Sequence, residues 1–131
     1  MSLQYAEAVH RLAAGIPSGS VLTYGDIAEL LGAGGPRQVG AAMAHSDGEL
    51  PWWRVLRANG TLRADLQERA LPHWIDEEIP LRGSRVLVGG ARWQPGDAGF
   101  AFIESIAADL AAGLAAGQDT GGGPNYRGRV L

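Results

Sequence analysis

Two short helical segments joined by a glycine-containing turn constrain the fold of this chain more than any other feature. Thr23 and Asp26 lie three residues apart in a capping-box pattern, in which each side chain accepts a hydrogen bond from the other residue's backbone. A helix is therefore expected to begin after Thr23, and Gly32 is well placed to end it. Pro36 suits the first position of a following helix, predicted over about 36–46. The two helices form a helix-turn-helix outline.

The second helix of this pair is predicted to have two very different faces. Val39 and Met43 are four residues apart, so they are expected to pack inward together. The opposite stripe places minimal side chains behind an arginine, and it consists of Arg37, Gly40, Ala41 and Ala44. Such a stripe lets the helix backbone approach another surface closely. On the residues alone, that surface is either a neighbouring helix or an external partner.

The remaining patterns predict a mainly α, winged-helix-like helix-turn-helix domain with small β-hairpins. The further elements expected are a helix over 3–14, a hairpin turning at Asn59-Gly60 between 54–58 and 61–63, a helix over about 65–74, a hairpin turning at Gly89-Gly90 between 85–88 and 91–93, and an amphipathic helix over about 97–116. We expect a domain over residues 1–95, an additional helix over 96–116 and a flexible tail over 117–131.

The residue inventory excludes several kinds of chemistry. The chain contains no Cys, which excludes disulfides, thiolate metal ligands and a cysteine nucleophile. His10, His45 and His73 show no metal-ligand spacing, and neither a phosphate-binding glycine loop nor a serine-nucleophile motif is present. The acidic run Asp76-Glu77-Glu78 is interpreted as a solvated edge with no partner. We therefore expect no metal and no cofactor.

Neither a membrane segment nor a secretion signal is expected from the sequence. No stretch approaches about 18 continuous apolar residues. The first twelve residues lack the basic start, apolar run and cleavage site of a signal peptide. A cytoplasmic protein is therefore expected, and we expect it to be a monomer.

Charge is distributed unevenly along the chain. The net charge is −3, from 11 Arg against 14 acidic residues, which argues against an extensive non-specific nucleic-acid surface. Residues 36–63 nevertheless hold four Arg against two acidic residues. This segment includes Trp52 and Trp53, and arginine and tryptophan side chains stack on bases and bind phosphates. The pattern favours DNA binding, although buried tryptophans with scattered surface arginines would produce it as well.

Four short motifs follow one another in a distinctive order and spacing. They are Ile16-Pro17-Ser18-Gly19, Thr23-Tyr24-Gly25-Asp26-Ile27-Ala28, Arg37-Gln38-Val39-Gly40-Ala41-Ala42-Met43 and Pro51-Trp52-Trp53-Arg54-Val55. Together they resemble the DNA-binding domain of the O6-alkylguanine-DNA alkyltransferases, well over residues 3–64 and loosely over 65–95. Those enzymes carry Pro-Cys-His-Arg-Val at the last motif, where the cysteine takes the alkyl group. Trp52 at the cysteine position resembles the alkyltransferase-like proteins of this family, which recognise alkylated guanine without repairing it.

The resemblance implies DNA-binding roles for one set of residues. In the family, the helix-turn-helix enters the minor groove, and an arginine fills the gap left by a flipped nucleotide. Arg37 resembles that arginine. Tyr24 resembles the tyrosine that crowds the neighbouring phosphate and promotes rotation of the target. Ser46 is the nearest counterpart of an asparagine that follows the recognition helix. The implied DNA-binding residues are Tyr24, Arg37, Gln38, Gly40, Ala41, Ala44 and Ser46.

The resemblance also implies a pocket for the flipped base. Trp52 would line it, with Trp53 and Arg54 as supports, and Arg63 could lie over its mouth. Trp53 replaces a histidine that many relatives keep, which is expected to alter the adducts that fit. The implied pocket residues are Tyr24, Trp52, Trp53, Arg54, Val55, Leu56 and Arg63.

The function implied is non-enzymatic sensing of O6-alkylguanine in duplex DNA. The sensor would bind and flip the damaged nucleotide and signal to nucleotide excision repair proteins. Transfer of the alkyl group is not expected, because an indole cannot attack an alkyl carbon as a thiolate does. Two alternatives stay open. One is a helix-turn-helix transcription regulator, although Gly40, Ala41 and Ala44 can read few base edges. The other is an interaction module that kept the fold and lost DNA binding.

Overall fold

The structure is a computed structural model that describes residues 3–46 and 48–120. In chain order its elements are α1 (Leu3–Ala14), β1 (Leu22–Thr23), α2 (Tyr24–Leu31), α3 (Pro36–Ala44), the 3-10 helix η1 (Trp52–Arg54), β2 (Val55–Leu56), α4 (Ala64–Asp76), β3 (Leu81–Arg82), β4 (Arg85–Val86), α5 (Val88–Ala91) and α6 (Asp97–Thr120). The mainly α architecture predicted from the sequence is confirmed. α4 continues through Pro72 to Asp76, two residues past its predicted end.

Helices α2 and α3 form the predicted helix-turn-helix. The Thr23 hydroxyl accepts a hydrogen bond from the Asp26 N–H at 3.0 Å, and the Asp26 carboxylate accepts one from the Thr23 N–H at 2.9 Å, which completes the capping box. Gly32 ends α2 with φ +70°, a left-handed conformation that favours glycine. At the start of α3, the Gln38 side chain accepts a hydrogen bond from the Gly35 N–H at 2.7 Å. Both helix starts are thus determined by local capping.

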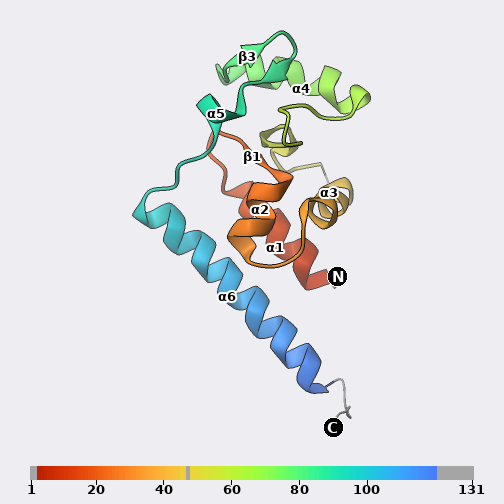
Figure 1. Ribbon diagram of the computed structural model, residues 1–131, viewed down its shortest axis with the longest axis vertical. Helices are drawn as coiled ribbons and strands as arrows, with labels where there is room; N and C mark the ends of the chain where they lie inside the picture. The colour runs from red at the N-terminus through yellow and green to blue at the C-terminus, as the bar shows by residue number, and fades with distance from the viewer. Residues whose placement is uncertain (1–2, 47, 121–131) are drawn as a thin grey trace.

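A first core forms where α1, α2, α3 and α6 pack together (Figure 1). Val39 and Met43 lie in this core, as their spacing predicts. The Tyr5 hydroxyl donates a hydrogen bond to the Ala33 carbonyl at 2.9 Å, which holds the turn between α2 and α3 against α1. Other large side chains of the core are Val9, Leu12, Ile27, Leu31, Val55, Ile103, Ile106 and Leu110.

A second core lies beneath α4 and the β3–β4 hairpin. Trp74 is fully buried there, and its indole N–H donates a hydrogen bond to the Trp53 carbonyl at 2.7 Å. Strands β1 and β2 pair in parallel, with Leu22 opposite Val55. Val55 belongs to the first core and Leu56 to the second, because successive side chains of a strand point to opposite faces. Strand β2 therefore joins the two cores.

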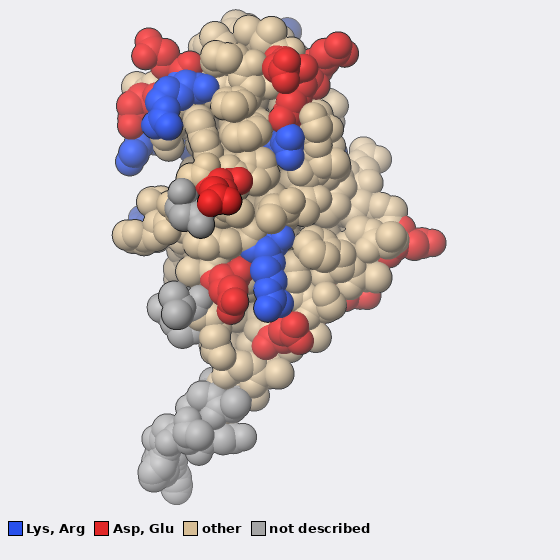
Figure 2. All heavy atoms as spheres, turned by 180° about the vertical axis from the view of Figure 1, so that it is seen from behind, with Lys and Arg blue, Asp and Glu red and all other residues tan. Residues whose placement is uncertain are grey.

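Helix α6 crosses the outside of α1 and α2 and continues beyond them (Figure 1). Seen from behind, the surface of the molecule carries acidic and basic side chains that are interspersed among other residues (Figure 2). Its stripe of Ile103, Ile106 and Leu110 is buried in the first core, in agreement with the predicted amphipathic pattern. The structure describes α6 as far as Thr120, so the helix includes residues 117–120 at the start of the predicted tail. The rest of that predicted tail lies outside the described residues.

The same helix contains a long apolar segment. Asp97–Ala115 has a mean hydropathy of 1.5 and is long and apolar enough, by length and composition only, to cross a membrane. The sequence prediction missed this because it considered only uninterrupted apolar runs. Some of its apolar residues, namely Ile103, Ile106 and Leu110, are buried in the first core.

The prediction of a β-hairpin around Asn59-Gly60 is wrong. A turn does form there, since the Gly60 N–H donates to the Arg57 carbonyl at 2.9 Å and the Arg57 N–H donates to the Thr61 carbonyl at 3.0 Å. Residues 55–56, however, pair with β1, and the Leu62 N–H donates to the Gln67 side chain at 2.8 Å. Long-range pairing and a helix-capping contact replace the local ladder.

The hairpin predicted to turn at Gly89-Gly90 is also misplaced. The actual hairpin joins β3 to β4 through Gly83-Ser84, and Gly83 has φ +62°. Gly89 and Gly90 lie within α5. Residues 91–93 pair with Val21 instead. The Val21 N–H donates a hydrogen bond to the Ala91 carbonyl, and the Trp93 N–H donates one to the Val21 carbonyl, each at 2.9 Å. A distant strand partner again displaces the local one.

Candidate nucleic-acid interface

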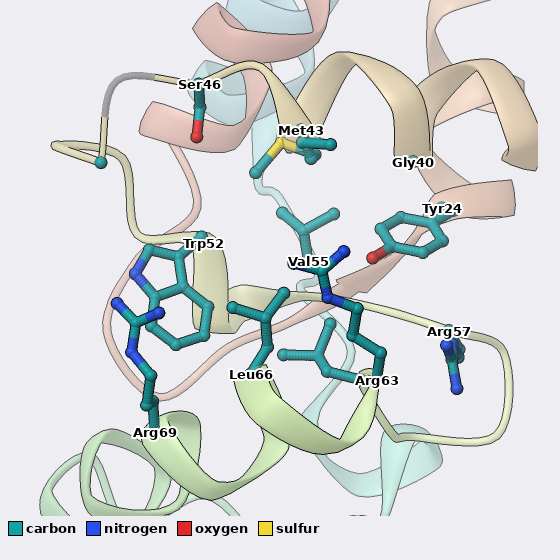
Figure 3. Close-up of a pocket in the computed structure, with 13 residues that line it drawn as sticks. Tyr24, Gly40, Met43, Ser46, Trp52, Val55, Arg57, Arg63, Leu66 and Arg69 are labelled. Atoms are coloured by element: carbon teal, nitrogen blue, oxygen red, sulfur yellow. The ribbon is translucent and has the colours of Figure 1, made fainter.

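A cavity of about 370 Å³ opens between α3, the η1–β2 segment and the N-terminal half of α4 (Figure 3). Its wall combines small, aliphatic, aromatic and arginine side chains, namely Tyr24, Gly40, Met43, Ala44, Ser46, Gly48, Trp52, Val55, Arg57, Leu62, Arg63, Leu66 and Arg69. Its volume lies at the lower end of the range of roughly 300–1,000 Å³ for small-ligand pockets. The lining suits a planar group that is partly apolar and rich in electrons.

The outer face of α3 borders the cavity and is smooth. Ala41 and Ala44 are exposed, while Gly40 is half-buried against the Tyr24 ring. Arg37 and Gln38 are exposed at the N-terminal end of the helix. Because the middle of this face carries no long side chain, the α3 backbone can come close to an external surface.

Tyr24 stands at the start of α2, and its hydroxyl points into the cavity (Figure 3). Its ring lies next to Gly40, where a Cβ atom would be 3.6 Å from Tyr24 Cε2. Burial raises the pKa of the Tyr24 phenol, although the charges of Arg57 and Arg63 partly offset this effect. The phenol therefore stays protonated near neutral pH and keeps a hydrogen-bond donor at the cavity wall.

Trp52 presents its indole to the cavity from η1, opposite the N-terminal half of α4 (Figure 3). The Arg69 guanidinium carbon lies 5.4 Å from the Trp52 ring centroid, within cation–π distance. The ring also makes edge contacts with Trp53 and His73, at centroid distances of 5.7 and 5.9 Å. Arg69 and the stacked Trp53–His73 pair thus hold the indole, which also lines the cavity.

Trp53 and Arg54 do not line the cavity but lie behind Trp52, where both bind Glu77. The Trp53 indole N–H donates to Glu77 Oε2 at 2.9 Å, and its ring stacks on His73 at 3.8 Å. Arg54 donates to Glu77 through Nε at 3.0 Å and through Nη2 at 2.5 Å. The Arg54 and Glu77 side chains are 15% and 8% exposed, so this is a buried ion pair.

The prediction that the acidic run 76–78 has no partner is therefore wrong for Glu77. Burial acts to raise the pKa of the Glu77 carboxyl, but hydrogen bonds from Arg54, the Gly19 N–H and Trp53 outweigh it and hold this pKa below its usual value. Arg54 Nη1 also donates to the Ile16 carbonyl at 2.9 Å. One carboxylate thus ties the end of α4 to η1 and to the loop after α1.

The structure brings together many of the residues implied by the resemblance and separates others. Of the implied pocket residues, Tyr24, Trp52, Val55 and Arg63 line the cavity. Trp53 and Arg54 lie behind it, and Leu56 is fully buried in the second core. Of the implied DNA-binding residues, Tyr24, Gly40, Ala44 and Ser46 line the cavity, while Arg37, Gln38 and Ala41 lie on the exposed face of α3. Their roles in DNA binding stay predictions.

Several cavity residues were not identified from the sequence. They are Met43, Gly48, Arg57, Leu62, Leu66 and Arg69. Leu66 and Arg69 are three residues apart on a predicted helix, so helical spacing could have placed them on one face. No local pattern indicates that this face of α4 lies opposite Trp52.

The side chains that line the cavity offer binding chemistry. Within residues 3–46 and 48–120, no group of three or more His, Asp or Glu side chains is placed to hold a metal ion. Arg57, Arg63 and Arg69 supply positive charge around an aromatic and aliphatic wall. Such a wall stabilises a planar ring by stacking and an anionic or polar group by charge–dipole contacts.

Two curated proteins are similar to part of this chain. The "DNA base-flipping protein" of Escherichia coli (strain K12) is 41% identical over 63 residues, which cover 44% of this chain and 47% of that protein. "Alkyltransferase-like protein 1" of Schizosaccharomyces pombe is 48% identical over 50 residues, which cover 36% of this chain and 46% of that protein. The matched part thus spans about half the length of these relatives.

Solved structures of a relative match a larger part of the chain. S. pombe Atl1 in complex with damaged DNA containing O6-carboxymethylguanine has a TM-score of 0.63 and 30% identity, over 72% of this chain and all of that one. S. pombe ATL in complex with DNA gives 0.62 and 29% over the same shares. The family model for the 6-O-methylguanine DNA methyltransferase DNA-binding domain matches residues 4–75, which is more than half of the chain. The chain therefore belongs to the 6-O-methylguanine DNA methyltransferase DNA-binding-domain family.

Proposed function

We propose that this protein is a non-enzymatic sensor of O6-alkylguanine in duplex DNA. It docks α3 in the minor groove, rotates the damaged nucleotide out of the stack into the cavity, and holds it there without transferring the alkyl group. The observation that carries this proposal is Trp52, which stands at the family's acceptor-cysteine position and presents an indole to a cavity large enough for a small ligand. The relatives named for base flipping and for damaged DNA support it.

The absence of alkyl transfer follows from the chemistry of the cavity wall. Transfer needs a strong nucleophile that attacks the alkyl carbon, and the chain contains no Cys. The indole of Trp52 has no comparable nucleophile, and it is held by Arg69, Trp53 and His73. It offers an apolar surface on which an alkyl adduct can pack.

The smooth face of α3 supports docking against DNA. Exposed Ala41 and Ala44 allow close approach of the backbone, and Arg37 projects from the first turn of the helix. The N-terminus of a helix also favours a nearby phosphate. In the proposed complex, Arg37 fills the space that the rotated nucleotide leaves, and Tyr24 crowds the adjacent phosphate from beside the cavity.

Rotation of a nucleotide costs a few kcal/mol, which contacts in the cavity must offset. Trp52 and Arg69 supply stacking and cation–π surfaces, and Arg63 and Arg57 supply charge near the opening. The proposal extends to signalling towards nucleotide excision repair proteins. The cytoplasmic location and the monomeric state stay predictions.

A fluorescence-anisotropy titration tests the proposal, with one DNA duplex prepared with and without a single O6-methylguanine. The wild-type protein should bind the damaged duplex more tightly. Arg37→Ala should weaken binding to it by about tenfold or more, which corresponds to about 1.4 kcal/mol. Arg11→Ala is the matched control, because Arg11 lies on α1 in an exposed ion pair with Asp109. Equal affinity for both duplexes, or an Arg37→Ala variant that binds as the control does, would refute the flipping mechanism.

A further inference from the structure

The β3–β4 hairpin carries two arginines side by side on its outer face. Leu81 pairs with Val86, and Arg82 pairs with Arg85 across the turn at Gly83. Val86 is buried in the second core. Because successive side chains of a strand point to opposite faces, the Arg82–Arg85 pair points away from that core. Both arginines are exposed.

This pair of charges is unfavourable in the protein alone. Like charges directly opposite each other in an antiparallel ladder are destabilising. Within the part of the chain that the structure describes, neither Arg82 nor Arg85 forms an ion pair, whereas Arg11, Arg54, Arg63 and Arg92 each bind a carboxylate. An anion that lies across both guanidinium groups would relieve the repulsion.

The hairpin is firmly attached to the loop that borders the cavity. The Val86 N–H donates a hydrogen bond to the Gly60 carbonyl at 2.9 Å. The Gln67 side chain also donates to the Ser84 carbonyl. Gly60 has φ +83°, and a Cβ atom there would lie 2.1 Å from the Val86 carbonyl oxygen, so the contact is too close for any other residue. The position of the two arginines relative to the cavity is therefore fixed by backbone contacts.

The backbone path from the cavity to the hairpin is short. Arg57 lines the cavity, and its carbonyl accepts a hydrogen bond from the Gly60 N–H. Gly60 binds Val86, which is the neighbour of Arg85. Two hydrogen-bonded contacts of about 5 Å each and one peptide unit of about 4 Å add up to about 15 Å, which is the greatest Cα distance that this path allows between Arg57 and Arg85. Each strand of B-DNA advances by about 3.4 Å per phosphate, so the hairpin lies within the length of about four base pairs from Arg57.

We propose that Arg82 and Arg85 form a second DNA contact, which binds the phosphate backbone within about four base pairs of the nucleotide held in the cavity. This inference rests on the proposed function, because that function brings the duplex to the cavity. Phosphate contacts position a protein on DNA and carry no base information. The hairpin should therefore raise the affinity for damaged and undamaged duplexes by the same factor and leave the preference for the lesion unchanged.

The test is the salt dependence of binding, measured by anisotropy on a duplex with one central O6-methylguanine and on its undamaged counterpart. Each arginine that neutralises one phosphate contributes about 0.9 to the slope of log K against log salt concentration. The double variant R82Q/R85Q should therefore reduce the magnitude of the slope by about 1.8 on both duplexes. R11Q removes one arginine charge on α1 and should leave the slope as in the wild-type protein.

The outcomes separate the two proposals. A smaller slope with an unchanged ratio of damaged to undamaged affinity supports the hairpin contact. If R82Q/R85Q keeps the wild-type slope while the wild-type protein prefers the lesion, the hairpin contact is refuted and the proposed function stands. If the wild-type protein binds neither duplex, both are refuted. Thermal unfolding of R82Q/R85Q at or above the wild-type temperature would show that the exposed pair can be changed without loss of the fold.

Discussion

Replacing Glu77 by glutamine removes one half of the buried ion pair while keeping the shape of the side chain. The two Glu77 oxygens accept four hydrogen bonds, from Arg54 Nε and Nη2, from the Trp53 indole and from the Gly19 N–H, at 2.5 to 3.0 Å. A glutamine amide has one acceptor oxygen and one NH₂ group. Because each Glu77 oxygen accepts two of these bonds, two of the four donors would then face the NH₂ group.

The expected cost follows from burial. Removing one partner of a buried pair leaves an uncompensated charge and costs about 3–5 kcal/mol. Arg54 retains 15% exposure and its bond to the Ile16 carbonyl, so we expect the lower end, about 3 kcal/mol, for Glu77→Gln. For a domain of this size, 1 kcal/mol shifts Tm by roughly 3–5 °C. Tm should therefore fall by about 10 °C.

Urea and thermal unfolding measure this loss directly. The matched control is Asp109→Asn, which breaks the exposed pair with Arg11, whose side chains are 51% and 74% exposed. Such a surface pair contributes about 0–1 kcal/mol. If Glu77→Gln destabilises the protein no more than Asp109→Asn does, the reasoning that makes Glu77 the link between α4, η1 and the loop after α1 is wrong.

Three further outcomes are expected. The pKa of the Glu77 carboxyl is held below its ordinary value of 4.5, so the ionised carboxylate stabilises the fold fully above that pH, and this contribution is lost as the pH falls through the folded-state pKa. A plot of unfolding free energy against pH should therefore have a flatter acid limb for Glu77→Gln than for the wild-type protein. Trp52→Cys should not restore alkyl transfer, because Trp53 stands where the family's enzymes carry the histidine that activates the thiol, and the nearby His73 ring is stacked on Trp53. An alkylated cysteine in the mass spectrum of that variant would contradict this. Gly60→Ala should destabilise the fold by about 2 kcal/mol or more, because its Cβ would overlap the Val86 carbonyl and its φ is left-handed. Gly40→Ala should change the stability by about 1 kcal/mol or less, because its Cβ would lie at an ordinary 3.6 Å from Tyr24. Urea unfolding of both variants measures this difference.

The reach of sequence reasoning differs between elements of the same fold. The start and end of α2 were predicted correctly because Thr23, Asp26 and Gly32 act within a few residues of one another. The turn at Gly60 was also predicted, but its strand partners were not. A hairpin requires that no better partner exists elsewhere, and here β1 lies more than thirty residues earlier in the sequence and takes the place of the local strand.

The candidate site shows the same division. Residue identity and helical spacing are enough to show that an indole stands at the family's acceptor-cysteine position, that the chain has no thiol, and that α3 carries a smooth face headed by Arg37. These properties belong to single residues or to one helix. Three long-range contacts are visible only in the folded chain: Arg69 and Leu66 lie opposite Trp52, Glu77 binds Arg54 and Trp53, and the Arg82–Arg85 pair lies next to the loop of Arg57. Contacts of this kind join residues that are distant in sequence, and they exist only once packing of the two cores has fixed which surfaces meet.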